Sequence, residues 1–397
     1  MGSKLDICLE ELRGELIDFA QALVRIPSET CREQAAAELT ARTMQRLGYD
    51  AVTIDEMGNV LGCMGTGNPR LLFDSHLDTV TVNDRPAWSV DPFGGEIRQG
   101  RLYGRGAVDM KCGLAASVFG AYAAKQAGLL PENGAVYVSA STAEEDYDGA
   151  SVKYLLEHTG LRPEGVVICE PTSLRIATGH RGRALILIRM QGIGCHASAP
   201  EKGRNPVYLL EPIIGRVQSL ADRLAALPGE HGSVALTNIY CTTASNNSVP
   251  QDATLVLDRR LALGETEELI GQEMDALVAG TEAQWCFSDI PATSWRGQAF
   301  VFHSFLPAWE LPQGHPLAQQ AARACEEVLG KPAALFKLGC STNGVTTAGV
   351  FNLPTIVLGP GDLAVAHARD EYCPVQDLVD ACGIYARLCS GSKGVAQ

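Results

Sequence analysis

The sequence lacks several features that would place it in other classes of protein. No run of Lys and Arg is long enough to form a basic stripe, and the formal net charge is −14. Such a chain would be repelled by phosphate backbones, which argues against a nucleic-acid binder. No apolar run approaches the ~20 residues that a membrane span needs, so we expect no membrane attachment. No phosphate loop of the P-loop or GxGxxG type follows an expected strand.

The cysteines are numerous but form no motif. The chain has 13 of them, and no two stand in a CxxC spacing, which argues against a zinc ribbon or a thioredoxin-like site. No signal peptide precedes the first expected helix. We therefore expect free thiols and a cytoplasmic location. The hydrophobic fraction of 46% is typical of a globular protein, and 397 residues exceed one typical domain.

Strands and helices alternate through much of the chain. Short apolar runs predict buried strands, and longer segments with helical apolar spacing predict helices. This alternation is typical of an α/β domain with a largely parallel central sheet. The expected strands span 70–74, 135–139, 166–169 and 355–358, and the expected helices span 9–26, 33–47, 112–127 and 315–329.

A different pattern occupies residues 180–292. Its order is βαββαβ, which is typical of a small ferredoxin-like domain. We therefore predict a second domain at 180–292, inserted into a first domain formed by 1–179 and 293–397. The expected strands of the insertion span 183–191, 233–241, 252–262 and 283–288, and its helices span 205–226 and 265–279.

Acids and histidines stand near the carboxyl ends of the expected strands, where open α/β sheets place their sites. Taken singly, each has a structural explanation. Asp109 could cap the helix at 112–127, the glutamates could belong to a solvated loop, and a lone loop histidine is usually structural. The candidates are His76, Asp78, Asp109, Glu144, Glu145, Glu170 and His367.

Taken together, these residues indicate a metal centre. Two histidines and several acids, spread over separate strand ends, form an N/O donor set that suits two divalent metals. No cysteine belongs to the series. Two metals that share a bridging carboxylate, with one free acid as the base, are typical of metal-assisted hydrolysis. The alternative is a binding protein that kept the fold and lost the chemistry, but none of the expected acids and ligands is missing.

Several ordered motifs carry a resemblance to a known family. The sequence resembles the M20 metallopeptidases, the group of acetylornithine deacetylase, succinyl-diaminopimelate desuccinylase, aminoacylase and glutamate carboxypeptidase. Residues 179–183 and 341–345 most resemble its branch of hydrolases linked to selenium metabolism in bacteria. The family motifs are Ser75-His76-Leu77-Asp78-Thr79, Gly104-Arg105-Gly106, Asp109-Met110-Lys111, Ala143-Glu144-Glu145, Glu170-Pro171-Thr172, His196-Ala197-Ser198, Asn247-Ser248-Val249-Pro250 and Ala366-His367.

The resemblance implies a zinc-peptidase-like catalytic domain and an inserted ferredoxin-like lid or dimerisation domain. It also implies two divalent metal ions per chain, either zinc or, alternatively, cobalt or manganese. His76 and Glu170 would hold one metal. Glu145 and His367 would hold the other, and Asp109 would bridge the two. A cis peptide after Asp109 is a further expectation from the family.

The resemblance also implies roles for residues that bind no metal. Asp78 would orient His76, and Glu144 would be the general base and acid. His196 would stabilise the oxyanion, and we predict that it does so in the site of a homodimeric partner. Asn247 and Arg260 would meet the carboxylate or carbonyl of the substrate.

The expected reaction is hydrolysis of an amide bond in an N-acyl amino acid or a small peptide with a free carboxylate. A dipeptidase or carboxypeptidase is the alternative, because these enzymes share every catalytic residue. The sequence departs from the family at two positions. His180 stands where desuccinylases carry a second arginine, and Ala348 stands where many members have Asp. These departures leave the identity of the acyl group undetermined.

Overall fold

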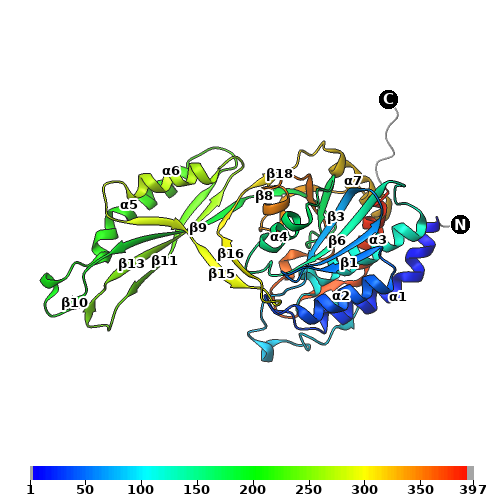
Figure 1. Ribbon diagram of the computed structural model, residues 1–397, viewed down its shortest axis with the longest axis horizontal. Coiled ribbons are helices and arrows are strands. Elements are labelled where there is room, and N and C mark those ends of the chain that lie inside the picture. Colours follow the sequence, from blue (N-terminus) through cyan, green and yellow to red (C-terminus); the bar gives the residue numbers. More distant parts are fainter. Residues whose placement is uncertain (1–2, 391–397) are drawn as a thin grey trace. The chain divides into compact units, whose positions relative to one another are not determined.

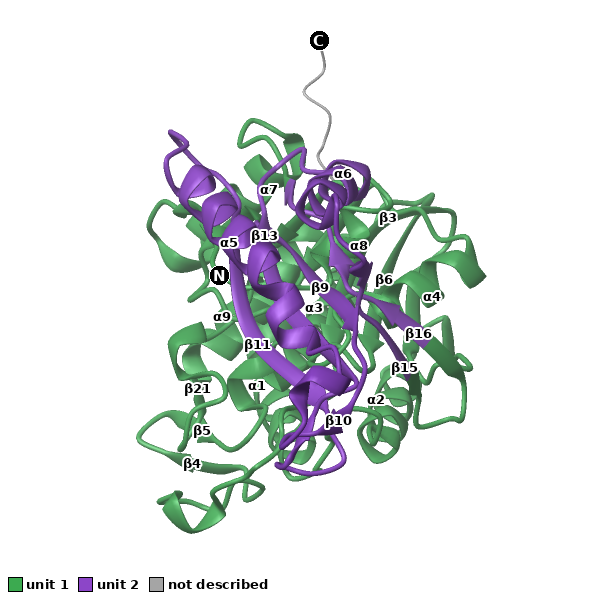
Figure 2. Ribbon diagram, turned by 90° about the vertical axis from the view of Figure 1, so that its left-hand side faces the viewer, with its two compact units in different colours: residues 1–180, 292–300, 310–397 green, residues 181–291, 301–309 purple. Residues whose placement is uncertain are grey.

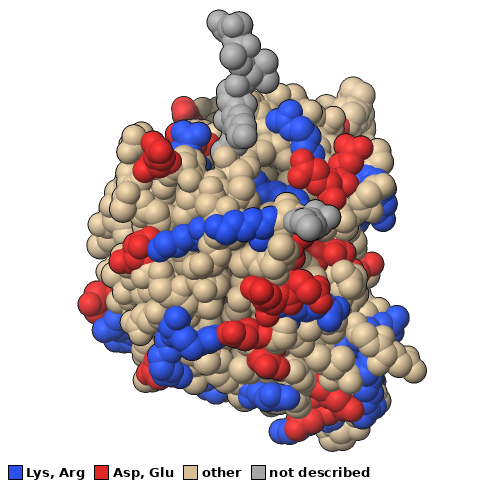
Figure 3. Space-filling model, turned by 90° about the vertical axis from the view of Figure 1, so that its right-hand side faces the viewer, with Lys and Arg blue, Asp and Glu red and all other residues tan. Residues whose placement is uncertain are grey.

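The computed structural model describes residues 3–390. The chain divides into two compact units, coloured separately in Figure 2. Unit 1 contains residues 1–180, 292–300 and 310–397, and unit 2 contains residues 181–291 and 301–309. Among the described residues, no helix combines the length and apolar character needed to cross a bilayer. On the face shown in Figure 3, acidic and basic side chains are intermixed.

Unit 1 is built on a nine-stranded sheet (Figure 1). Its central strands β6, β3, β7 and β20 are neighbours and run parallel, whereas β1 and β2 join one side antiparallel. The expected strands are therefore present, and the centre of the sheet is parallel as predicted. In sheet order the strands are β1 (Ala51–Ile54), β2 (Val60–Gly65), β6 (Gly134–Ser141), β3 (Asn68–His76), β7 (Gly165–Ile168), β20 (Thr355–Val357), β8 (Ile176–His180) and β18 (Trp309–Glu310), with β19 (Leu335–Leu338) paired to β8.

Helices and a small second sheet complete unit 1. The four helices expected from the sequence are all present, with ends within a few residues of the predicted ones except at the start of the first. The small sheet contains β4 (Glu96–Arg98), β5 (Arg101–Tyr103) and β21 (Tyr372–Pro374). The helices are α1 (Lys4–Val24), α2 (Gln34–Arg46), α3 (Cys112–Ala127), α4 (Ala150–Thr159), α7 (Pro316–Leu329), α8 (Gly344–Thr347) and α9 (Val375–Leu388).

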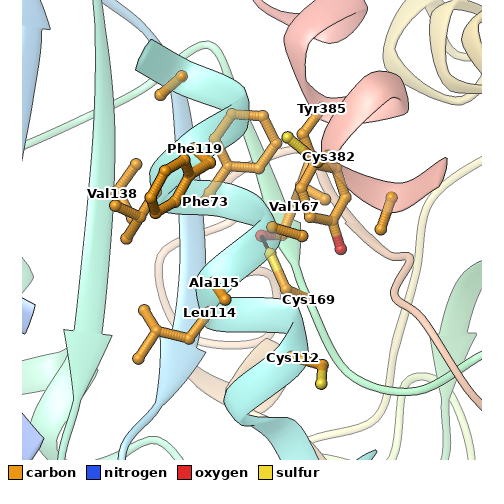
Figure 4. Packing of buried hydrophobic residues seen from close by; sticks show 14 of the residues in the cluster. Phe73, Cys112, Leu114, Ala115, Phe119, Val138, Val167, Cys169, Cys382 and Tyr385 are labelled. Atoms are coloured by element: carbon orange, nitrogen blue, oxygen red, sulfur yellow. Dashed lines mark hydrogen bonds between the residues drawn. The ribbon is translucent and has the colours of Figure 1, made fainter. Parts of the chain in front are cut away.

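Helix α3 lies at the centre of the unit 1 core. It contacts α1 and α9 as well as strands β2, β3 and β6. A helix enclosed in this way should be apolar on all sides, and α3 consists mainly of Ala and other small or apolar residues. Figure 4 shows Phe119 of this helix and Phe73 of β3 in the same cluster of buried residues. The ring centroids of Phe73 and Tyr385 in α9 lie 5.0 Å apart.

Unit 2 is an antiparallel sheet with two helices. The spatial order β11-β13-β9-β14 and the chain order βαββαβ confirm the predicted ferredoxin-like fold. Along β9, buried residues alternate with less buried ones, so a single face of the sheet packs on the core. The elements are β9 (Gly182–Gln191), β10 (Cys195–His196), α5 (Pro206–Ala225), β11 (Ser233–Thr242), β12 (Ser248–Val249), β13 (Asp252–Leu261), α6 (Glu267–Val278) and β14 (Gln284–Phe287).

The return from unit 2 to unit 1 is less direct than the predicted boundary at 292–293. Strands β15 (Asp289–Thr293) and β16 (Ala299–His303) pair as a two-stranded sheet. The chain then adds β17 (Phe305–Leu306) to β9, so residues 301–309 belong to unit 2. Hydrophobic periodicity could not predict this pairing, because a two-residue strand is too short to show a period.

Close packing of α3 against the sheet generates a prediction. A Cβ atom built on Gly113 would lie 2.3 Å from the backbone carbonyl oxygen of Cys169, which cannot move without disturbing β7 and the loop that follows it. We expect Gly113→Ala to lower the free energy of unfolding by about 1–3 kcal/mol, the usual cost of overpacking. Chemical denaturation of the metal-free protein measures this change.

Gly14 in α1 is the matched control, because its Cβ would meet nothing within 4 Å. There we expect Gly14→Ala to raise the free energy of unfolding by about 0.5–1 kcal/mol through helix propensity alone. Equal effects at the two glycines would contradict the packing described for α3.

Candidate metal centre

The candidate metal ligands of unit 1 come from one edge of its sheet. The carboxyl ends of the parallel strands β3, β6, β7 and β20 meet at this edge. The potential ligand atoms form two groups, and within each group all atoms lie within 4.8 Å of one another. One group is His76 with Asp109 and Glu145, and the other is His76 with Glu144 and Glu170. His76 ends β3, Glu144 and Glu145 follow β6, Glu170 follows β7, His367 follows β20, and Asp109 lies in the short helix η2 (Ala107–Lys111) before α3.

Asp109 lies between the two histidines. Its Oδ1 is 3.0 Å from Nε2 of His76, and its Oδ2 is 3.3 Å from Nε2 of His367. Each oxygen thus faces a different imidazole, which is the arrangement that a bridging carboxylate requires. The remaining acids divide in the same way. Glu170 lies 3.4 Å from Nε2 of His76, and Glu145 lies 3.0 Å from Nε2 of His367. The Asp109–Met110 peptide bond is cis, as the family resemblance implies.

A backbone carbonyl sets the tautomer of His76. Its Nδ1 lies 2.9 Å from the carbonyl oxygen of Asp78, which can only accept a hydrogen bond. Nδ1 therefore carries the proton of the neutral ring, which leaves Nε2 as the nitrogen that could bind a cation. The Asp78 carboxylate is farther away, at 3.6 Å. Its oxygens instead accept the amide N–H groups of Glu144 and Glu145, each at 3.0 Å.

The ionisation of the site reflects crowded acids in a buried space. Burial raises the pKa of Glu170 to about 8 and that of Glu144 well above its usual range. Hydrogen bonds to Asp109 and Glu145 raise the pKa of His367 to about 10. Burial lowers the pKa of His76, but hydrogen bonds to neighbouring carboxylates outweigh it and raise this pKa well above the usual value. Protons thus balance part of the negative charge, and bound cations would displace them.

A buried ion pair that the sequence analysis missed supports two of the candidate ligands. Glu371 is fully buried, and its Oε1 accepts the amide N–H groups of Val108 at 3.0 Å and Asp109 at 3.2 Å. Its Oε2 accepts Nη1 of Arg105 at 2.6 Å, and Nη2 of Arg105 donates to the carbonyl of His367 at 3.3 Å. Arg105 belongs to the family motif Gly104-Arg105-Gly106. Glu371 belongs to no motif, because only the fold brings it to Arg105.

The remaining candidates lie in unit 2. The side chain of His196 is exposed, and its Nδ1 lies 2.7 Å from Oγ of Ser198. The loop of Asn247 lies beside it, because the Ala197 N–H donates to the Asn247 carbonyl at 2.8 Å. Arg260 lies near the other end of β13, where its Nε donates to Asp258 at 2.7 Å. His196 pairs with Ser248 of β12, shortly before β13 begins at Asp252. Arg260 is eight steps further along that strand, about 26 Å at the usual rise, so unit 2 does not bring it to His196.

The donor set of unit 1 fits two divalent metal ions. It consists of imidazole nitrogens and carboxylate oxygens, which suit zinc and similar metals. A shared carboxylate between two imidazoles divides the ligands into two groups, and the buried excess of acid calls for cations. The fold and this site together define a metal-dependent hydrolase of the two-metal type.

Comparison with known proteins agrees with this class. Residues 72–390 match the model of peptidase family M20/M25/M40. The uncharacterized Escherichia coli (strain K12) protein YgeY is 34% identical over 383 residues, which cover 96% of this chain and 94% of that protein. The chain therefore belongs to the M20 peptidase family and is a metal-dependent hydrolase of amide or peptide bonds.

Solved structures share the fold over almost the whole chain. The di-peptidase Dug1p of Saccharomyces cerevisiae superposes with a TM-score of 0.71 at 13% identity and covers 98% of both chains. YxeP of Bacillus subtilis, a dinuclear metal-binding peptidase of the M20 family, gives a TM-score of 0.66 at 15% identity and covers 96% of this chain and 98% of its own. At these identities the likeness shows the fold alone.

The Arg105–Glu371 pair generates a stability prediction. Glu371→Gln keeps an acceptor for the two amides but leaves the Arg105 guanidinium buried without its counter-charge. We expect the free energy of unfolding of the metal-free protein to fall by about 3–5 kcal/mol, the usual cost of removing one partner of a buried ion pair. Urea denaturation in a chelator measures this value.

Glu164→Gln is the matched control. Glu164 pairs with Arg70, but their side chains are 52% and 34% exposed. Solvent screens such a pair, so we expect a change below about 1 kcal/mol. An equally small change for Glu371→Gln would show that the buried pair does not hold the Asp109 loop.

Proposed function

We propose that the protein hydrolyses the amide bond of an N-acyl amino acid or a small peptide with a free carboxylate, with two zinc ions as cofactors. One observation carries the proposal. The two Asp109 oxygens face different histidines. The Glu144 carboxylate is farther from His76 than Asp109 is, at 3.9 Å from Nε2. A carboxylate that adjoins the metal site without bridging it is in the right place to move protons.

Each chain residue then has a defined task. Bound divalent ions would polarise the substrate carbonyl and acidify water. Glu144 accepts the proton of the attacking water and gives it to the leaving amine. Without metal, burial raises the pKa of Glu144 well above its usual range. Asn247 and Arg260 are the proposed contacts for the carbonyl or carboxylate of the substrate.

A dipeptidase or carboxypeptidase activity is the second candidate within the same chemistry. The structural neighbour Dug1p is described as a di-peptidase. Both activities need the same ligands and the same base, so the substrate decides between them. A cytoplasmic location is also part of the proposal. All 13 cysteines lie in the described part of the chain and are free thiols, which suits a reducing compartment.

A substrate screen with a matched variant tests the proposal. Zinc-loaded protein is offered N-acetyl, N-succinyl and N-carbamoyl amino acids together with dipeptides. We expect hydrolysis of at least one class, and Glu144→Gln should lower its kcat by several orders of magnitude. Elemental analysis should give two metals per chain in both proteins, because Glu144 is proposed to move protons and not to bind metal.

Metal content distinguishes the possible failures. The atoms of His76, Glu144 and Glu170 also lie close enough to share an ion. If Glu144→Gln loses a metal, Glu144 is a ligand and the assignment of the neighbouring glutamates is reversed. If the metal-free protein hydrolyses the substrate at the same rate, the two-metal proposal is wrong.

We further propose that a homodimer forms through unit 2. Strand β11 is at the edge of its sheet and is mostly exposed. Ile239 and Tyr240 on this strand are 42% and 46% exposed. An unpaired edge with apolar side chains favours pairing with a second copy, which gives a two-fold dimer. In this dimer, His196 of one chain would donate a hydrogen bond to the oxyanion in the site of the other.

Mixed dimers test the role of His196. We expect His196→Ala alone to lower kcat by ~10²–10³, the usual cost of one lost oxyanion donor. Mixing it with Glu144→Gln should restore activity toward half of the wild-type value per mixed dimer, because one site then has its own Glu144 and the partner's His196. No recovery after verified subunit exchange would place His196 in the site of its own chain or outside catalysis.

A further inference from the structure

The turn that carries Glu144 and Glu145 has an unusual set of hydrogen bonds. Four consecutive amide N–H groups, those of residues 142–145, all donate to side chains of other segments. Each acceptor side chain is fully buried. The acceptors are Oδ1 of Asn59 for Thr142 at 3.0 Å, Oε1 of Glu33 for Ala143 at 2.9 Å, and Oδ1 and Oδ2 of Asp78 for Glu144 and Glu145, both at 3.0 Å.

The shape of this turn needs such support. Ala143 has a φ of 57°, a left-handed conformation that residues with a Cβ adopt only when their surroundings hold them there. The turn must also direct the two glutamates to different places, with Glu145 toward His367 and Glu144 toward His76. The hydrogen bond on the Ala143 amide acts at the strained residue itself.

Glu33 makes this bond from a fully buried position. It precedes α2, is 0% exposed, and its Oε1 also accepts the Cys31 N–H at 2.9 Å. Its Oε2 has no hydrogen-bond partner among the described residues. Burial of a carboxyl group with so few donors opposes folding. Stability alone therefore does not account for the presence of Glu33.

The two glutamates of the turn depend on it to different degrees. The Glu145 carboxylate has a second anchor, because its Oε1 accepts the Val80 N–H at 3.1 Å while its Oε2 faces His367. Among the described residues, no side chain or backbone amide forms a hydrogen bond with the Glu144 carboxylate, and Nε2 of His76 lies 3.9 Å from it. The position of the Glu144 carboxylate is therefore set mainly by the backbone of the turn.

We propose that Glu33 is a positioning residue for Glu144. Through the amide of Ala143 it holds the turn in the one shape that places the Glu144 carboxylate beside the metal site. The inference rests on the proposed role of Glu144 as the proton carrier. It assigns a function to a residue that is 111 positions away in the sequence and touches neither metal nor substrate.

Two uncharged variants isolate the hydrogen bond. Glu33→Leu fills a similar volume without an acceptor, whereas Glu33→Gln keeps an oxygen at the position of Oε1. We expect Glu33→Leu to lower kcat by ~10²-fold, the scale of a misplacement of about 1 Å, with two metals per chain and little change in KM. Glu33→Gln should recover most of this loss.

Hydrogen exchange supplies a readout that does not depend on activity. In the metal-free protein, the amides of Ala143 and Glu144 should exchange faster in Glu33→Leu than in the wild type or in Glu33→Gln. Tyr49→Phe is the control for a general loss of stability. It removes a buried hydrogen bond of 2.8 Å from the Tyr49 hydroxyl to the Val118 carbonyl, in the unit 1 core but not in the turn. We expect its kcat and its exchange at the turn to stay unchanged.

The outcomes separate this inference from the proposed function. If Glu144→Gln is inactive but Glu33→Leu keeps the wild-type kcat and exchange rates, Glu33 is not a positioning residue. If Glu144→Gln itself keeps its activity, the proposed function fails first. Should Glu33→Leu not fold, Glu33→Asp replaces it, because a carboxylate shorter by one methylene cannot reach the amides of both Cys31 and Ala143. An unchanged kcat in Glu33→Asp would equally overturn the inference.

Discussion

The repulsion among buried carboxylates is the constraint on which the rest of this structure depends. Asp109, Glu144, Glu145 and Glu170 meet at one sheet edge, where burial penalises their charged forms. The imidazoles of His76 and His367 lie among these acids, and Asp109 faces both. The arrangement is stable only if protons or cations balance the charge. The same imbalance that opposes folding therefore creates the affinity for metal.

The surrounding polar groups are organised to hold these acids in place. Several of the segments that carry the candidate ligands are tied down through their backbones. Glu371 accepts the amide of Asp109, Arg105 donates to the carbonyl of His367, and Asp78 accepts the amides of the two glutamates. The Glu145 side chain is also anchored directly, because its Oε1 accepts the Val80 N–H. The ligand side chains are thus oriented before any ion binds, which reduces the reorganisation that binding would require.

The two units differ in the architecture of their sheets. In unit 1, parallel strands bring ligands from distant parts of the sequence to one edge, and α3 gives that edge a rigid, tightly packed support. Unit 2 is an antiparallel sheet whose edge strand β11 is mostly exposed, and the proposed homodimer would form there. Its His196 in β10 lies beside the turn that carries Asn247, whereas Arg260 lies near the far end of β13.

The sequence by itself determined the fold class, the ferredoxin-like order of unit 2 and the acids and histidines at strand ends, because periodicity and strand-end position are local signals. The positioning residues were not accessible in this way. Glu33 and Glu371 resembled ordinary acids beside a helix and in a loop, and no spacing links Glu33 to Ala143 or Glu371 to Arg105. Residues 301–309 also join unit 2 through contacts between distant segments, such as the pairing of β17 with β9. Contacts between distant segments are decided by the tertiary structure, because burial and hydrogen-bond partners exist only once the chain has folded.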